Sequence, residues 1–329
     1  MKIAIVILNW NGLKLLKEFL PSVVNNSGDN PIYIIDNNSD DNSIDFINKN
    51  YINITLIRND KNYGYAKGYN EGLKHVNEEV FCLLNNDVEV TTGWLDPIIK
   101  EFEFDNFLVV AQPKILDYKN KNKFEYAGAA GGYIDYFGYP YCRGRINDSI
   151  EIDKGQYDKN VDIFWASGAC FIVRKKTFDE LNGFDERFFC HMEEIDLCWR
   201  AFNLGFDCYS VTSSKVFHVG AATIKKNSKK IYLNYRNSLL MMTKNLPLKN
   251  LLSTLFVRLN LDIISSFKLL IQGDTSFFIA IYKAHIDYFF ILRSILKERD
   301  NASKKANYFK INSIVYKYFL LGKKKFFQL

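Results

Sequence analysis

An acidic side chain follows a hydrophobic run in the segment Leu83-Leu84-Asn85-Asn86-Asp87-Val88. The run Val80–Leu84 is apolar and ends in two amides and a carboxylate. Ligands of open α/β sheets bind outside the carboxyl ends of the strands, so Asp87 stands where a charged ligand or a metal would be met. A hard oxygen ligand suits Mg²⁺ or Mn²⁺ carrying a substrate diphosphate. The same tripeptide is also an ordinary turn sequence.

Two further residues could contact a nucleotide. Asp36 ends the apolar run Ile32–Asp36, where a mononucleotide-binding half-sheet commonly holds a base or ribose through a carboxylate. The alternative for Asp36 is a turn or a helix cap. Lys67 follows Gly64 at the start of a predicted helix, and a helix N-terminus with a lysine suits a phosphate. The alternative for Lys67 is a solvated surface lysine.

A second cluster of carboxylates opens a predicted helix at Glu193–Leu204. Glu193, Glu194 and Asp196 fall within four residues and follow two phenylalanines. Asp196 and Arg200 are spaced to pair on the helix surface. Glu193 and Glu194 then remain to face a cleft, where one of them could deprotonate an attacking hydroxyl. The alternative is that these charges only complement the helix dipole.

Histidine and arginine candidates lie outside these segments. His218 follows a predicted strand, and a neutral imidazole there could bind a metal, although a lone histidine among apolar neighbours also suits a core. Arg143 and Arg145 could grip an acceptor pyrophosphate through bidentate hydrogen bonds. The alternative for both arginines is a solvated loop with packed aromatic side chains.

The elements that must position these side chains alternate between strand and helix over the first ~110 residues. Apolar runs separated by helical patterns indicate right-handed βαβ units and a mostly parallel sheet, hence an α/β fold. The predicted strands are Ile3–Asn9, Ile32–Asp36, Ile54–Arg58 and Val80–Leu84, and the predicted helices are Leu13–Val24, Ser43–Asn48 and Tyr65–Val76.

The rest of the chain divides into three parts. Residues 113–162 are rich in small and aromatic residues, and we expect an irregular excursion that covers the site. Regular structure should return with strands at Gly168–Val173 and Asp207–Val211 and a helix at Lys176–Leu181. Long apolar helical runs, Leu251–Leu270 and Phe277–Leu296, are interrupted by charged residues.

Charge separates the chain into two predicted domains, 1–222 and 223–329. The first contains 23 Lys and Arg against 32 Asp and Glu, and the second contains 20 against 5, so a net charge of +6 hides an acidic body and a basic extension. The extension therefore points to an anionic membrane surface as a partner, with packing on the body or on a second subunit as the alternative.

The composition and the cysteine pattern favour a globular protein in a reducing cytoplasm. If it associates with a membrane, we expect it to be a peripheral protein on the cytoplasmic face of the inner membrane. The six cysteines form no CxxC pair, and several lie in apolar runs, so we expect buried free thiols. A membrane-spanning helix needs roughly 20 mostly apolar residues. No uncharged stretch here exceeds 11 residues, so we do not expect an integral membrane protein.

Taken together, these segments resemble family 2 glycosyltransferases of the GT-A fold, and most closely the rhamnosyltransferase-like branch that builds bacterial surface polysaccharides. The resemblance runs from about Lys2 to Gly220. It rests on Ile5–Gly12, Ile34–Asp40, Asn62–Gly72, Leu83–Val88, Gly93-Trp94-Leu95, Gly183–Phe189 and Glu193–Arg200.

The resemblance implies roles for particular residues. Asn9 and Asp36 would contact the nucleoside of a sugar nucleotide, and Asn85-Asn86-Asp87 occupies the place of the family's DxD-type motif. Asn86 would then face the donor and Asp87 the divalent metal, whose binding His218 would complete. Glu194 stands at the aspartate of the family's Glu-Asp pair, the usual catalytic base.

The reaction implied is an inverting, metal-dependent transfer from a donor such as dTDP-rhamnose to a polysaccharide or lipid-linked glycan. Two alternatives remain: a nucleotidyltransferase, and a sugar-nucleotide- or glycan-binding module with little turnover. A dinucleotide-binding oxidoreductase is disfavoured because the first strand leads into Asn-Trp-Asn-Gly without G-x-G-x-x-G. The basic extension contains no recognisable nucleic-acid-binding module.

Overall fold

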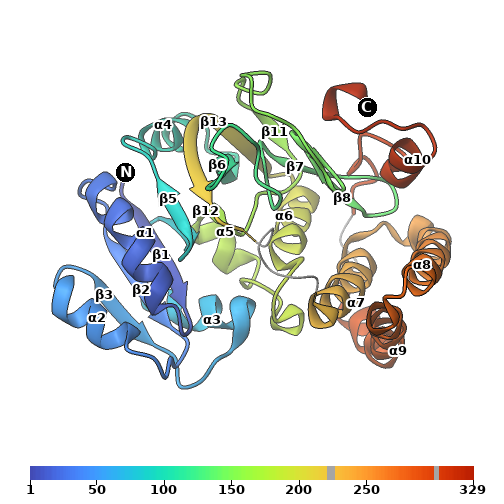
Figure 1. Ribbon diagram of the computed structural model, residues 1–329, viewed down its shortest axis with the longest axis horizontal. Coiled ribbons are helices and arrows are strands. Elements are labelled where there is room, and N and C mark those ends of the chain that lie inside the picture. The colour runs from blue at the N-terminus through green and yellow to red at the C-terminus, as the bar shows by residue number, and fades with distance from the viewer. Residues whose placement is uncertain (221–226, 300–303) are drawn as a thin grey trace.

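A computed structural model describes residues 1–220, 227–299 and 304–329. It contains a large mixed sheet flanked by helices, a small antiparallel sheet and a group of carboxy-terminal helices (Figure 1). The strands are β1 Ile3–Asn9, β2 Ile32–Asp36, β3 Thr55–Arg58, β4 Val80–Asn85, β5 Val88–Val90, β6 Leu108–Asp117, β7 Gly132–Ile134, β8 Pro140–Cys142, β9 Arg145–Ile146, β10 Ser149–Ile150, β11 Val161–Ile163, β12 Cys170–Arg174 and β13 Asp207–His218.

The helices alternate with the strands in the amino-terminal half and follow one another in the carboxy-terminal third. Most predicted elements match the observed ones to within a few residues, because the apolar periodicity fixes their type. The α-helices are α1 Leu13–Asn26, α2 Ser43–Asn50, α3 Gly64–Leu73, α4 Asp96–Phe104, α5 Lys175–Glu180, α6 Glu193–Leu204, α7 Ser228–Asn245, α8 Leu248–Ile271, α9 Thr275–Glu298 and α10 Ile314–Phe319, with 3₁₀ turns at η1 Glu186–Phe188 and η3 Phe326–Gln328.

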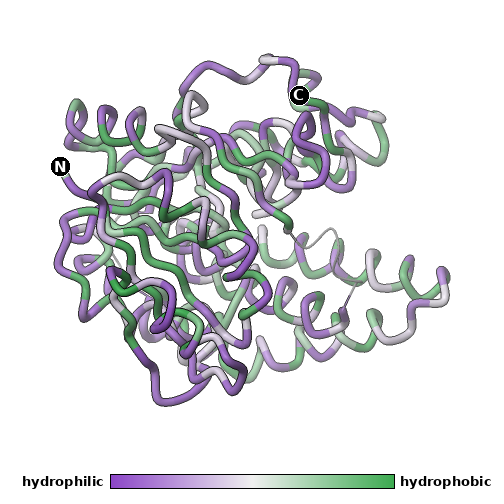
Figure 2. Tube along the Cα trace, turned by 60° about the vertical axis from the view of Figure 1, so that its left-hand side comes forward, coloured by the Kyte–Doolittle hydropathy of each residue, from purple (hydrophilic) through white to green (hydrophobic). Residues whose placement is uncertain are grey.

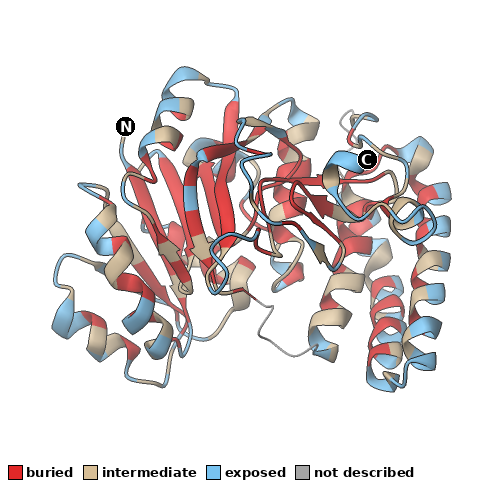
Figure 3. Ribbon diagram, turned by 45° about the horizontal axis from the view of Figure 1, so that its top comes forward, coloured by how far each residue is buried: buried red, intermediate tan, exposed pale blue. Residues whose placement is uncertain are grey.

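The large sheet runs β11-β13-β6-β12-β4-β1-β2-β3, with β5 paired to β13. Strands β1, β2, β3 and β4 are parallel, whereas β12 is antiparallel to both β4 and β6. Its central strands are buried on both faces, which explains their nearly continuous apolar sequences (Figure 3). The same strands form the hydrophobic centre of the molecule in Figure 2.

Two parts of the middle segment are more regular than expected. Residues Leu108–Asp117 form the ten-residue strand β6, and β7–β10 form an antiparallel sheet in the order β10-β9-β8-β7. The prediction of an irregular excursion over 113–162 is therefore wrong at both places. Short strands joined by glycines carry too weak a periodic signal to be recognised from the sequence.

The carboxy-terminal helices α7, α8 and α9 pack on one another, and α7 also contacts α6 of the body. The predicted domain boundary, between residues 222 and 223, lies outside the described residues and stays a prediction. Within the described residues, α9 is long and apolar enough to span a membrane by length and composition, which the sequence analysis did not expect. Helices in protein cores pass the same test, and α9 buries Ala284 and Tyr288.

All six cysteines are free thiols, and five of them are buried, as predicted.

Candidate active site

The carboxyl ends of three adjacent parallel strands bring the predicted donor-binding residues together. Strand β1 lies between β2 and β4, and its register places Asn9 opposite Asp36. The Asn9 amide Nδ2 donates to Asp36 Oδ1 at 3.1 Å and to Ser39 Oγ at 3.2 Å, and Asn86 Nδ2 donates to Asn9 Oδ1 at 3.2 Å. Asn9, Asp36 and Asn86 therefore form one polar cluster at the sheet edge where ligands bind in this class of fold.

Gly12 allows this cluster to form. A Cβ atom at position 12 would lie 2.2 Å from Asn9 Oδ1 and 2.4 Å from Asn86 Nδ2, closer than atoms can approach. The glycine of the Asn-Trp-Asn-Gly segment therefore leaves the space in which the two amides meet. Trp10, beside the cluster, is 55% exposed, and the sequence analysis assigned it no role.

A long-range strand pairing places His218 beside Asp87. Strand β5, which follows Asp87 directly, pairs with the end of β13 so that His218 lies opposite Val88. His218 Nε2 is 3.0 Å from Asp87 Oδ1, and its Nδ1 is 3.4 Å from Glu125 Oε1. The sequence analysis missed Glu125, because nothing in its local sequence distinguishes it from a surface glutamate.

The two carboxylates change the charge of the histidine. Burial alone would lower the pKa of His218, but the hydrogen bonds and charges of Asp87 and Glu125 raise it to about 10. Burial opposes ionisation of Asp87, yet the hydrogen bond and charge of His218 outweigh it and lower the pKa of Asp87. His218 is therefore an imidazolium here, whereas the sequence analysis expected a neutral ring.

Asp87, His218 and Glu125 have side chains of the chemical kind that binds a divalent cation. Glu125 and His218 are both buried, and Glu125 Oε1 faces His218 Nδ1 at 3.4 Å, near the limit of a hydrogen bond. Carboxylate oxygens and an imidazole nitrogen are ligands that Mn²⁺ accepts, and Mg²⁺ favours the oxygens. No group of three acidic, histidine or cysteine side chains within 1–220, 227–299 and 304–329 is arranged to hold an ion alone. A cation here would need oxygens from a ligand.

The second carboxylate cluster, Glu193 and Glu194, begins helix α6. One carboxylate oxygen of each is buried without a hydrogen-bond partner. Burial, and the neighbouring charge of Glu194, raise the pKa of Glu193 well above its usual range. Burial raises the pKa of Glu194 to about 7. A carboxylate whose pKa lies near neutrality is suited to accept a proton from a hydroxyl group.

The backbone that leads into this helix is strained. Phe189, His191 and Met192 have φ angles of 61°, 70° and 74°, in the left-handed region that is unfavourable for residues other than glycine. Such strain costs of order 1–3 kcal/mol per residue and persists only where the surroundings impose it. Clustered left-handed residues beside two carboxylates, each with one buried and unpaired oxygen, are typical of a functional site.

Two helices impose this conformation. The buried side chain of Asn237, on α7, donates from Nδ2 to the carbonyls of Phe188, Cys190 and His191 at 2.9, 3.0 and 2.8 Å. From the other side, the backbone N–H groups of Tyr65 and Ala66 donate to the Phe189 carbonyl at 2.8 and 3.2 Å.

Helix α6 itself is fixed through Asp196. Arg200 Nε donates to its Oδ2 at 2.8 Å, as predicted from the i,i+4 spacing. Lys244 Nζ and Asn245 Nδ2 on α7 also donate to Asp196, each at 2.8 Å. Sequence reasoning missed these α7 residues because they lie about 50 residues downstream of the loop and helix they hold.

Lys67 does not occupy the position expected of a phosphate ligand. Its ammonium pairs with Glu186 Oε2 at 2.8 Å on the surface. The Phe189 carbonyl already accepts hydrogen bonds from the first N–H groups of helix α3. The Phe189 carbonyl thus occupies the helix terminus where an anion was predicted. The contacts of Lys67 are those of the alternative, a surface lysine.

Arg143 and Arg145 are structural in this conformation. Both are buried, and Arg143 donates to the carbonyls of Ala130 and Lys159 at 3.3 and 3.2 Å. Arg145 Nε donates to the Tyr126 carbonyl at 2.9 Å, and its guanidinium lies over the Tyr126 ring. The predicted bidentate grip on a pyrophosphate does not fit these contacts, because backbone carbonyls take the donors.

A cavity of about 320 Å³ opens beside the carboxylate loop. Met192, which directly precedes Glu193, forms part of its wall. Further walls come from Tyr126 and Arg145 of the middle segment, Asn234 and Tyr235 of α7, Leu261 of α8 and Phe319 of α10. Aromatic rings and amide groups of this kind suit a sugar or another polar ring.

Comparison with known proteins agrees with this arrangement. The model of glycosyl transferase family 2 matches residues 4–181. The hexosyltransferase Agl10 of low-salt glycan biosynthesis in Haloferax volcanii is 24% identical over 197 residues, which cover 57% of this chain and 60% of that protein. An N-acetylglucosaminyl-diphospho-decaprenol L-rhamnosyltransferase of Mycobacterium tuberculosis is 43% identical over 54 residues, 16% of this chain and 18% of the relative.

Both relatives are matched over less than two thirds of their own length. Among solved structures, the mannosyltransferase PcManGT from Pyrobaculum calidifontis, in complex with GDP-Man and Mn²⁺, has a TM-score of 0.53 at 11% identity and covers 88% of this chain and 87% of its own. That likeness concerns the fold, and it agrees with the predicted GT-A class. With more than half of its residues matched by the family model, the chain belongs to glycosyl transferase family 2.

Proposed function

We propose that the protein is an inverting glycosyltransferase that moves a sugar from a nucleoside-diphosphate sugar to a polysaccharide or lipid-linked glycan. The observation that carries this proposal is Glu194, a half-buried carboxylate with one buried, unpaired oxygen and a pKa of about 7, which follows a strained loop at the start of α6 in a family 2 fold. A rhamnosyltransferase among the relatives supports dTDP-rhamnose as the first donor to test.

Donor binding falls to the polar cluster at the ends of β1, β2 and β4. Asn9 and Asp36 are completely buried, and Asn9 bridges Asp36 to the half-buried Asn86, so this network holds Asn86 rigidly at the surface that would meet the nucleoside. A rigid surface reduces the entropy lost when the donor binds. Trp10, exposed beside this cluster, offers a ring on which a base could stack.

Asp87 and His218 would hold a divalent metal, Mg²⁺ or Mn²⁺. The bound cation would offset the negative charge that develops on the departing nucleoside diphosphate. Glu125 keeps the His218 ring oriented through Nδ1, leaving Nε2 directed at Asp87. Because His218 carries a proton in this structure, metal binding at Nε2 would release that proton.

Glu194 acts as the general base. Its carboxylate takes the proton of an acceptor hydroxyl as the hydroxyl oxygen attacks the anomeric carbon, and the bond from that carbon to the diphosphate oxygen breaks. A single displacement of this kind inverts the anomeric centre. We place the acceptor in the cavity beside Met192, because this wall residue directly precedes Glu193 and Glu194 in the chain. The free thiols support a cytoplasmic location for the reaction.

The test is a donor screen with purified protein. UDP-, GDP- and dTDP-sugars are supplied with Mn²⁺ or Mg²⁺, and nucleoside diphosphate release is measured with and without EDTA. Asp87→Ala and Glu194→Gln are compared with Glu103→Gln, which alters an exposed carboxylate on α4. We expect metal-dependent release from one donor, lost in the first two variants and retained in the third.

Other outcomes favour the alternatives. Donor binding without release, even when glycan acceptors are added, would indicate a binding module. A product that keeps the nucleotide linkage would indicate a nucleotidyltransferase. Release that Glu194→Gln leaves unchanged would remove Glu194 from the mechanism.

A further inference from the structure

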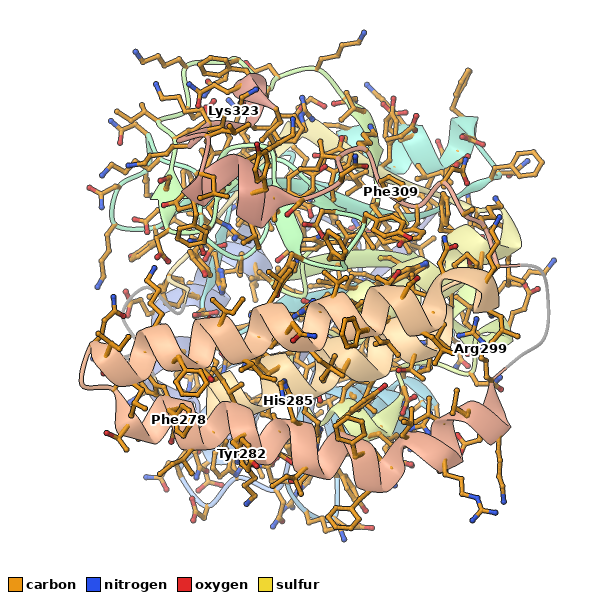
Figure 4. The ribbon with its side chains drawn as sticks, turned by 90° about the vertical axis from the view of Figure 1, so that its right-hand side faces the viewer. Phe278, Tyr282, His285, Arg299, Phe309 and Lys323 are labelled. Carbon is orange, nitrogen blue, oxygen red and sulfur yellow. The ribbon has the colours of Figure 1, made fainter. Side chains whose placement is uncertain are left out.

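The outward faces of α8 and α9 are apolar. On α8, Leu252, Phe256 and Ile264 are 81%, 69% and 66% exposed, and on α9 Phe289 and Phe290 are 55% and 82% exposed. The two helices lie side by side across one face of the molecule, as Figure 4 shows. An exposed apolar surface that extends along two long helices marks an interaction site.

The inner face of α8 buries two leucines in its first half, Leu251 and Leu255, but it is polar from Arg258 onward. Arg258, Asp262 and Ser266 are all buried. Arg258 Nε donates to Asp262 Oδ1 at 2.9 Å, and Tyr139 OH donates to the same oxygen at 2.9 Å. In water, a surface helix places its charged residues outside and its apolar residues inside. The second half of α8, with its charged pair inside and its apolar side chains outside, therefore favours a medium outside the helix that is less polar than water.

Charge distinguishes between the candidate occupants of this face. The cations on the exposed positions of α8 and α9 are Lys249, Lys268, Lys283, Arg293 and Lys297. The anions are fewer, and two of them are engaged: Asp287 accepts a hydrogen bond from Tyr232, and Glu298 pairs with Arg187. A second copy of this face would bring like charges together, which is unfavourable. An anionic lipid surface supplies both phosphate groups and an apolar layer.

The carboxy-terminal segment extends the same face. Lys324, Lys325 and Phe327 are exposed, and Phe327 is 68% exposed. In Figure 4, α10 lies on the side of α8 away from α9, and the Lys268 ammonium of α8 sits over the Phe319 ring of α10 at 4.6 Å. Lysines interleaved with exposed aromatic rings are typical of segments that lie in a membrane interface.

We propose that the α8–α9 face lies in the interface of an anionic membrane, with Phe256 and Phe290 among the side chains inserted below the phosphate groups. The surrounding lysines contact those phosphates. Leu261 and Phe319 belong to this part of the molecule and also line the cavity beside Met192. A membrane-borne acceptor would then be presented next to Glu193 and Glu194. This last consequence rests on the proposed function, whereas the membrane contact itself does not.

The experiment is vesicle flotation of the full chain. Vesicles of phosphatidylcholine with 30% phosphatidylglycerol are compared with pure phosphatidylcholine at low and high salt. The test variant is Phe256→Ser/Phe290→Ser, and the matched control is Phe104→Ser/Phe107→Ser, which removes two equally exposed rings (89% and 66%) from the end of α4 and the loop after it. Circular dichroism and light scattering report folding and oligomeric state without reference to activity.

We expect the wild type and the control to float with the anionic vesicles, and the partition coefficient of the test variant to fall tenfold or more, since each insertion buries a phenyl ring. Three results would overturn the proposal. The wild type could stay at the bottom of the gradient at low salt. The test variant could bind as the wild type does, which would leave only lysine adsorption. A dimer lost in the test variant, without vesicle binding, would assign the face to a second copy.

Discussion

Asn237 should control the carboxylate loop without contacting any substrate. Its single amide donates to three carbonyls of residues 188–191, in a segment with three left-handed residues. The substitution Asn237→Ala removes these donors and leaves the overall shape of helix α7 unchanged. We therefore expect the loop to relax locally while the fold persists.

The magnitude follows from the hydrogen bonds lost. The three carbonyls share the two N–H groups of one amide, so the substitution removes two donors, and at about 1–3 kcal/mol for each donor the loss is roughly 2–6 kcal/mol. The three left-handed residues carry backbone strain of order 1–3 kcal/mol each. Without the Asn237 hydrogen bonds, little would hold the loop in this strained conformation. A whole domain is stable by about 5–15 kcal/mol, so local opening takes less free energy than global unfolding.

Hydrogen exchange measures this opening directly. Even the lower bound of about 2 kcal/mol corresponds to roughly thirtyfold faster exchange of the backbone amides between residues 186 and 196. Donor turnover should fall about 100-fold, because an ångström of misplacement of a catalytic group has effects of that size. The matched control is Asn260→Ala, since Asn260 is exposed and bonds only to the Phe256 carbonyl of its own helix.

The reasoning would be refuted by an Asn237→Ala protein whose loop exchanges at the wild-type rate. The strained conformation would then be maintained by packing against Tyr65 and Ala66 alone. Global unfolding of the variant, seen as a loss of the circular dichroism signal, would also contradict the prediction of local opening.

Three further predictions concern charge. Burial raises the pKa of Glu194 from 4.5 to about 7, so the folded state loses stability as the pH rises from 4.5 to 7. The Tm of Glu194→Gln should therefore exceed that of the wild type by an amount that grows over this pH range. A difference in Tm that does not depend on pH would contradict this prediction. Chelation by EDTA should weaken calorimetric nucleoside diphosphate binding at least tenfold in the wild type, and Asp87→Ala should show no such metal dependence. Arg258→Met removes the arginine that pairs with the buried carboxylate of Asp262 and leaves that charge only the neighbouring Tyr139 and His285, so urea unfolding should reveal a loss of about 3–5 kcal/mol, against under about 1 kcal/mol for Lys74→Ala in the exposed pair with Glu71.

The amino-acid sequence by itself determined the elements of the amino-terminal half and the polar residues that end them. Buried parallel strands are apolar throughout and stop at polar residues, so Asp36 and Asp87 could be assigned to the ligand-binding edge of the sheet from the sequence. Asn9 and Asn86 were assigned there through the resemblance to the family. The carboxylates at Glu193 and Glu194 were equally visible, because three acidic residues in four stand out from the packing pattern around them. The roles of these residues remain predictions.

Tertiary structure decided the partners of those residues. The pairing of β13 with β5 brings Asp87 to one nitrogen of His218, and its pairing with β6 brings Glu125 to the other. These contacts make the ring an imidazolium, and no local pattern encodes contacts between such distant segments. Only the tertiary structure shows that Arg143 is buried and donates to backbone carbonyls, because the sequence around a loop arginine does not indicate whether its side chain is solvated or enclosed. Helix periodicity and residue type are local properties of the chain, whereas pKa, hydrogen-bond partners and the medium outside a helix depend on what folding brings alongside.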